Sequence, residues 1–161
     1  MYSEDDMDLP YDNFTNYLNN FYSMWPTFVP SFVRVERVSN GQLFSSDHLL
    51  THTVQYDQLS QLNSKRFIRL HMDYNAMWIM PREALISTIN ESFARWETKG
   101  HIRETAASYI IWELKVPALY ELDSNGMISE KCHVYHLPNN YVNDLTTPLG
   151  KMNLNTIIQL I

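Results

Sequence analysis

Apolar side chains near the start of the chain recur at helical spacing. Four aromatic residues are three, four and four positions apart, at Phe14, Tyr17, Phe21 and Trp25. This spacing places them on one face of a helix, and Pro26 ends that helix because proline cannot donate the next backbone hydrogen bond. We therefore predict a helix over residues 13–25 whose aromatic stripe packs on the core; a ligand-binding role for the stripe is the alternative.

The next segments alternate with a period of two, which is typical of strands. Val33 and Val35 alternate with polar neighbours, and Asn40-Gly41 supplies the positive φ angles of a tight turn, so residues 32–46 are predicted to form a β-hairpin. The stretch FIRLHMDY repeats the alternation, and AMWIM follows as a short apolar strand candidate. Together they predict further strands over residues 66–80.

Helical spacing returns in the second half. Pro81 suits the first position of a helix over residues 81–98, and Gly100 suits its C-terminal cap. A second helix is predicted over residues 101–114. The stretch ALYELDSNGMISEKCHVYHL then predicts two strands within residues 117–137, around a turn at residues 123–126. The final stretch PLGKMNLNTIIQLI is compatible with a strand or a helix.

These elements predict a single α+β domain over residues 13–161, an antiparallel β-sheet packed with about three helices. A chain of 161 residues is long enough to bury a core without disulfides or metal. Residues 1–12 are polar and acidic, so we expect them to form a flexible N-terminal tail.

Charge and cysteine content narrow the classes of function. The net charge is −6, and the first 64 residues hold eight acids against Arg34 and Arg37. Such a chain is not expected to bind nucleic acid directly or sequence-specifically, because phosphate binding needs a cationic face. The single cysteine, Cys132, favours a reducing compartment and not secretion. No apolar run approaches the roughly 18 residues of a membrane span.

Catalytic and metal-binding patterns are weak. His48 and His52 are four residues apart, and His133 and His136 lie near Cys132, but the chain has no CxxC or HExxH pattern that would hold zinc. Cys132 and His133 are adjacent, so on a strand they would face opposite ways and could not act as a nucleophile and base. We therefore expect no enzyme, no metal and no cofactor.

Basic residues gather in the middle of the chain. A candidate basic patch comprises Lys65, Arg66, Arg69, Arg95, Lys99 and Arg103. Such a patch would bind an anionic membrane surface weakly. Solvated cations near a helix C-terminus are the alternative interpretation.

Three stretches resemble the matrix proteins of rhabdoviruses. An acid-flanked methionine segment of that family resembles EDDMDLPYD. The family's first core strand, turn and helix resemble SFVRVERVSNGQLFSSDHLL. Its exposed apolar loop and next strand resemble LKVPALYELDSNG and KCHVYHLP. The resemblance implies a viral structural protein of the cytoplasm and virion, peripheral at the inner membrane face. Its implied partners are itself, the viral nucleoprotein complex, the membrane and a host nuclear-pore mRNA-export factor.

The resemblance also implies two binding sites. Met7 would insert into the export factor, flanked by Asp5, Asp6 and Asp8. The apolar loop would mediate self-association and membrane contact through Val116, Pro117, Ala118, Leu119 and Tyr120.

Two alternatives remain open. YSMWPTFVPSFVRVERVSNGQLFSSDHLLT resembles the start of PRELI-type lipid-transfer domains, which would imply an internal apolar cavity. The other alternative is a generic protein–protein interaction module.

Overall fold

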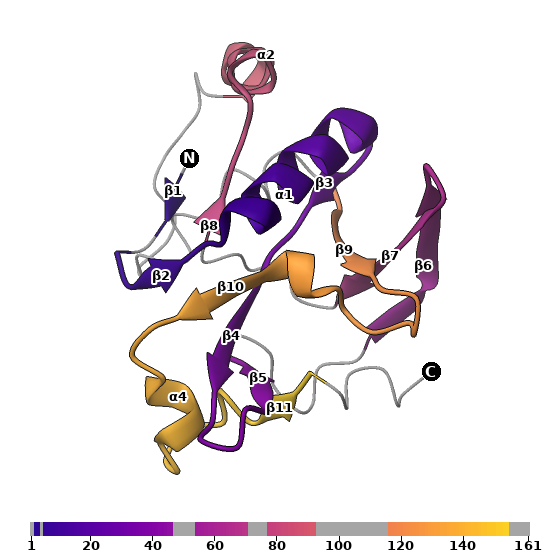
Figure 1. Ribbon diagram of the computed structural model, residues 1–161. Helices are drawn as coiled ribbons and strands as arrows, with labels where there is room; N and C mark the ends of the chain where they lie inside the picture. The colour runs from indigo at the N-terminus through magenta and orange to yellow at the C-terminus, as the bar shows by residue number, and fades with distance from the viewer. Residues whose placement is uncertain (1, 4, 47–53, 71–76, 93–115, 155–161) are drawn as a thin grey trace.

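The computed structural model in Figure 1 describes residues 2–3, 5–46, 54–70, 77–92 and 116–154. Its helices are α1 (Tyr11–Met24), α2 (Arg82–Ser92), the 3₁₀ turn η2 (Glu130–Cys132) and α4 (Asn140–Asn143). Its strands are β1 (Tyr2–Ser3), β2 (Met7–Asp8), β3 (Val29–Pro30), β4 (Val33–Arg37), β5 (Leu43–Ser45), β6 (Val54–Leu62), β7 (Lys65–Leu70), β8 (Met77–Trp78), β9 (Ala118–Leu122), β10 (His133–His136) and β11 (Met152–Asn153).

The strands form two main sheets and one short pair. The larger sheet has the order β11-β5-β4-β10-β2, and the smaller has the order β3-β9-β7-β6. β1 pairs with β8. In Figure 1 the smaller sheet lies at the right, the larger runs from β2 to β11 below it, and α1 crosses above both. This arrangement confirms an α+β fold.

The expectation of a purely antiparallel sheet is wrong. β10 pairs with β4 in parallel, and β3 pairs with β9 in parallel. Parallel neighbours need a long connection, and in both cases the paired segments lie far apart in the chain. Patterns within one short window carry no information about such a partner.

Several local predictions are confirmed. α1 covers the predicted first helix, β4 and β5 form the predicted hairpin with Gly41 at φ +86°, and α2 begins directly after Pro81. The predicted helix over residues 101–114 lies outside the described residues. The strand β6 was not predicted; it joins β7 through Asn63 and Ser64, both at positive φ, so an Asn-Ser turn marks this hairpin where Asn-Gly would be the usual signal.

The two strands predicted around residues 123–126 exist but belong to different sheets. Leu122 makes a single bridge to Ile128, and the chain then turns through η2 before β10 joins β4. The turn is therefore real, although it does not join two paired strands.

The aromatic face of α1 is core. Tyr17 and Phe21 are buried, and the Tyr17 ring stacks on Phe32 with ring centres 4.6 Å apart. Their cluster includes residues of both main sheets, such as Ala118 and Val134. Burial of these side chains is the main driving force that holds α1 over the sheets.

Candidate functional site

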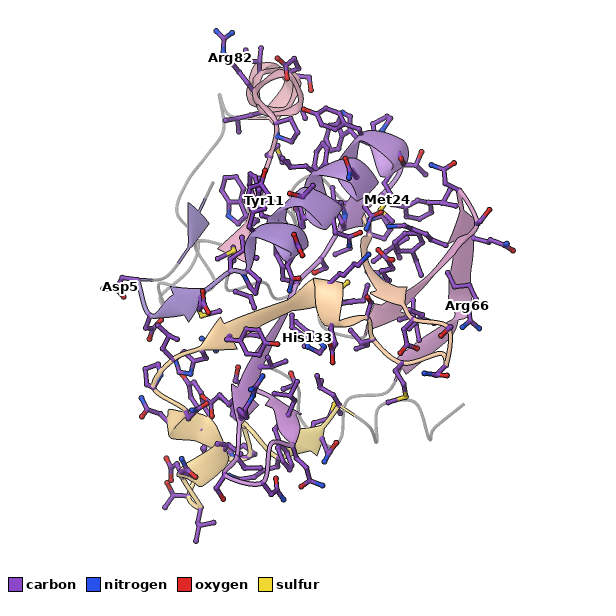
Figure 2. The ribbon with its side chains drawn as sticks, in the orientation of Figure 1. Asp5, Tyr11, Met24, Arg66, Arg82 and His133 are labelled. Carbon is purple, nitrogen blue, oxygen red and sulfur yellow. The ribbon has the colours of Figure 1, made fainter. Side chains whose placement is uncertain are left out.

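The acidic arm, residues 5–8, is attached to the fold at the edge of the larger sheet. Met7 and Asp8 form β2, which pairs antiparallel with His136 and Tyr135 of β10. Met7 is half-buried against the aromatic core cluster, whereas Asp5 points away from the fold (Figure 2). The arm is attached here because the open edge of β10 offers backbone hydrogen bonds and the core offers Met7 an apolar contact. The flexibility expected for residues 1–12 stays a prediction.

The arm brings Asp6 to a buried histidine. His136 Nε2 lies 3.2 Å from Asp6 Oδ2, and His136 Nδ1 lies 2.5 Å from Glu36 Oε1. Glu36 is 0% exposed, and the backbone N–H groups of Tyr141 and Val142 also donate to its carboxylate. This carboxylate–imidazole–carboxylate chain joins β2, β10, β4 and α4.

Sequence reasoning missed Glu36 because it occupies a polar position of an alternating strand. Such a position normally faces solvent. Here α4 covers it, and Gly150 allows that close approach: at φ +69°, a Cβ on Gly150 would lie 2.5 Å from the Tyr141 carbonyl carbon. No pattern near Glu36 in the sequence indicates that residues 140–150 cover its side chain.

The predicted apolar docking loop is a buried strand. Ala118, Leu119 and Tyr120 belong to β9, are almost fully buried, and lie between β3 and β7. Val116 and Pro117 are half-buried just before it. The assignment of residues 116–120 to self-association and membrane contact is therefore wrong, since a strand with neighbours on both sides and both faces buried also has a continuous apolar sequence.

A second buried polar cluster uses the first residue of the predicted basic patch. Lys65 Nζ donates to Glu121 Oε2 at 3.0 Å and to the side-chain oxygens of Asn16 and Asn20. Asn16 and Asn20 in turn donate to the same Glu121 oxygen at 2.9 and 2.8 Å. We call these four residues the Lys65–Glu121 cluster; it lies between α1 and the smaller sheet.

The cluster keeps Glu121 ionised. Burial alone would raise the pKa of Glu121, but the hydrogen bonds from Asn20, Asn16 and Lys65, together with the charge of Lys65, outweigh it and lower the pKa. Lys65 therefore forms a structural ion pair with Glu121, while its side chain remains 36% exposed.

The rest of the basic patch is only partly placed. Arg66 donates to the carbonyl oxygens of Asp123 and Ser124. Arg69 is half-buried in β7. Arg95, Lys99 and Arg103 lie outside the described residues. The structure therefore places only Lys65, Arg66 and Arg69 of the predicted patch.

Burial also decides the chemistry of Cys132 and His133. Burial raises the pKa of the Cys132 thiol to about 12, so the thiol stays protonated. Burial lowers the pKa of His133 to about 4, and neither ring nitrogen has a hydrogen-bond partner in the described part of the chain. Among the described residues no group of three or more His, Cys, Asp or Glu side chains could hold a metal ion, and His48 and His52 lie outside them.

An open groove lies between the C-terminal end of α1 and the start of α2. Its volume is about 510 Å³, and its lining residues are Phe21, Tyr22, Trp25, Pro81, Glu83 and Ala84. Tyr22 is 69% exposed, and the rings of Phe21 and Trp25 stack with centres 5.5 Å apart. This aromatic groove was visible in the sequence only as part of the aromatic run that predicted α1.

None of the described helices is long and apolar enough to cross a membrane. Comparison with known proteins found no family model, no curated protein and no solved structure that matches this chain. The functional argument therefore depends on the surfaces described above.

Proposed function

We propose that this chain is a non-enzymatic protein-interaction module that binds a basic peptide segment of a partner protein in the aromatic groove. The observation that carries this proposal is an open groove lined by aromatic rings and by one carboxylate, Glu83. Recognition grooves for peptides commonly combine an apolar floor with a few polar groups that set specificity.

The aromatic rings supply the apolar contact. The Tyr22 ring is largely exposed, so its apolar surface is open to a bound peptide. The rings of Phe21 and Tyr22 are arranged edge to face, with an angle of 82° between their planes and centres 6.4 Å apart. Both rings line the groove. Aliphatic stems of lysine and arginine pack on such rings, and their charged ends are attracted to the ring faces.

The charge of the groove selects a basic occupant. Glu83 is exposed at its rim, and the lining residues that the structure describes include no lysine or arginine. Arg82 is adjacent in the chain but points away from α1 in Figure 2. The net charge of −6 would further speed the encounter with a cationic segment.

A matched pair of tyrosines on α1 provides the test. The probe is a fluorescein-labelled peptide rich in lysine and arginine, with a glutamate-rich peptide of equal length as its control, and binding is followed by fluorescence polarisation. Tyr22→Ala should weaken binding of the basic peptide about tenfold, as truncation of an interface tyrosine does. Tyr11→Ala removes a ring that is 79% exposed on the same helix but outside the groove, and should leave the affinity unchanged.

Glu83→Gln should mainly slow association and flatten its dependence on salt. Equal affinities of the Tyr22 and Tyr11 variants, or preference for the acidic peptide, would rule out the groove as a basic-peptide site.

The resemblance to rhabdovirus matrix proteins supports a second candidate, a matrix-type structural protein that offers its acidic arm to a host export factor. The supporting observation is that the arm is held at a sheet edge by a two-residue strand, so it could detach. Self-association, which this candidate requires, no longer has a site at Val116–Tyr120. Light scattering over a concentration series tests it, and a monomer at every concentration would count against it.

A PRELI-type lipid-transfer function has no such support. It requires an apolar cavity between helix and sheet, whereas the aromatic stripe and the Lys65–Glu121 cluster fill the space beneath α1 in the described part of the chain.

A further inference from the structure

We propose that the acidic arm is a releasable latch, closed when His136 is doubly protonated and opened when His136 loses one proton. This inference is independent of the aromatic groove. It follows from the contacts of one imidazole ring with two carboxylates on different segments.

While both carboxylates are ionised, the ring can donate to both only in its charged form. His136 presents Nδ1 to Glu36 and Nε2 to Asp6. Ionised carboxylates are acceptors only, and a neutral imidazole carries one N–H. Loss of a proton therefore leaves one carboxylate facing a ring nitrogen lone pair.

The remaining imidazole N–H stays on Nδ1 of His136 and donates to Glu36. Glu36 is fully buried, so breaking its contact would leave a charge without solvent. Two backbone N–H groups, those of Tyr141 and Val142, also hold its position. The side chain of Asp6 is 38% exposed and can exchange the lost hydrogen bond for water. Asp6 is therefore the carboxylate that loses its hydrogen bond to His136.

Among the described residues, two cations lie near this contact. From β4, Arg34 lies over the Tyr141 ring at 5.3 Å, and from α4 that ring stacks on His136 at 5.4 Å. Lys151 donates to backbone oxygens of Tyr141 and Val142. On the arm itself Asp8 is exposed, and the second Asp6 oxygen has no hydrogen-bond partner within the described residues.

Among the described residues, few other contacts hold the arm. Besides the two-residue pairing of β2, Leu137 N–H donates to the Asp6 carbonyl oxygen at 2.9 Å, and Met7 is only half-buried. The pairing of β1 with β8 is equally short. Segments with so few bonds open locally at low cost, so one charge-assisted hydrogen bond can decide between the closed and open states.

The experiment places a nitroxide label on the arm through Asp5→Cys. Asp5 is exposed, and the native Cys132 is buried with a thiol pKa of about 12, so labelling is selective. Electron paramagnetic resonance then measures the mobile fraction of the arm as a function of pH, across the range in which the NMR signals of the His136 ring change. The ratio of open to closed arm should rise about tenfold or more with pH, as expected for loss of a hydrogen bond to a charged group. Its midpoint should match the titration of the His136 ring followed by NMR.

Asp6→Asn separates the latch from a general pH effect. An amide can accept a hydrogen bond from charged His136 and donate one to the neutral ring, so the arm should stay closed at every pH measured. Asp8→Asn removes an exposed carboxylate of the same arm and should leave the response unchanged. A mobile fraction that ignores the titration of His136, or a pH response that survives in Asp6→Asn, would overturn the latch.

Discussion

His133 illustrates at the residue scale how position changes the chemistry of a side chain. It is 3% exposed at the start of β10, and its ring nitrogens have no hydrogen-bond partner in the described part of the chain. Burial lowers its pKa from 6.5 to about 4, because a charged ring would lose its hydration. In this pH range His133 therefore binds a proton in the unfolded chain but not in the folded protein.

This difference predicts a loss of stability in acid. Because the unfolded state binds more protons between about pH 6.5 and about pH 4, His133 contributes stability above pH 6.5 that is lost as the pH falls through this range. The contribution is about 3 kcal/mol. His133→Leu should reduce this slope and raise the free energy of unfolding, whereas His133→Gln should reduce the slope without the gain, since it keeps unpaired polar atoms. Urea titrations at several pH values measure both, and an unchanged slope in both variants would assign the acid loss to other groups.

At the scale of elements, α1 carries a polar stripe beside its aromatic one. Asn13, Asn16 and Asn20 are buried and three and four residues apart. Asn13 donates to the backbone oxygens of Glu130 and His133, and the other two belong to the Lys65–Glu121 cluster. Buried polar groups of this kind are tolerated because each has partners.

The cluster predicts a coupled response to mutation. Lys65→Met should lower the free energy of unfolding by about 1–3 kcal/mol, because it leaves the Glu121 carboxylate buried without its cation. Adding Glu121→Gln should recover part of that loss, so the two changes are not additive. Arg66→Met alters the next residue of the same strand, an exposed cation bonded to backbone oxygens, and should cost within about 0.5 kcal/mol. Strictly additive effects of the Lys65 and Glu121 changes would show that the pair is not coupled.

At the scale of the whole molecule, α1 ties the two main sheets together. Its first turn bonds to η2 and β10, which belongs to the larger sheet, and its later turns bond to Glu121 of β9 in the smaller sheet (Figure 1). The aromatic cluster under α1 also contains residues of both sheets. One sheet cannot separate from the other without exposing this shared core.

This connection predicts a single cooperative unfolding transition. Far-ultraviolet circular dichroism reports the helices and sheets, and tryptophan fluorescence reports the four tryptophans, of which Trp25 and Trp78 pack against the core cluster. The two signals should give the same urea midpoint. Asn13→Ala should lower that midpoint for both signals together, because it removes the buried hydrogen bonds that hold α1 to η2 and β10. Separate midpoints would mean that the sheets unfold independently.

Elements whose signals are local are predictable from the amino-acid sequence alone. The spacing of Phe14, Tyr17 and Phe21 places α1 and its buried face, Asn40-Gly41 places the turn of the β4–β5 hairpin, and Pro81 places the start of α2. Each signal depends on contacts within a few residues, where backbone geometry and side-chain period act directly. The α+β class follows from the same signals.

The surface that each segment contacts depends on how the whole chain folds. Met7 and Leu119 were both predicted to be exposed, yet one lies half-buried on a sheet edge and the other lies in a central strand. Glu36 has the pattern of a solvent-facing residue, but α4 and His136, about a hundred positions away, enclose it. Burial and charge state depend on partners that the chain brings together only when it folds, so the latch and the Lys65–Glu121 cluster leave no signature in any short stretch of sequence.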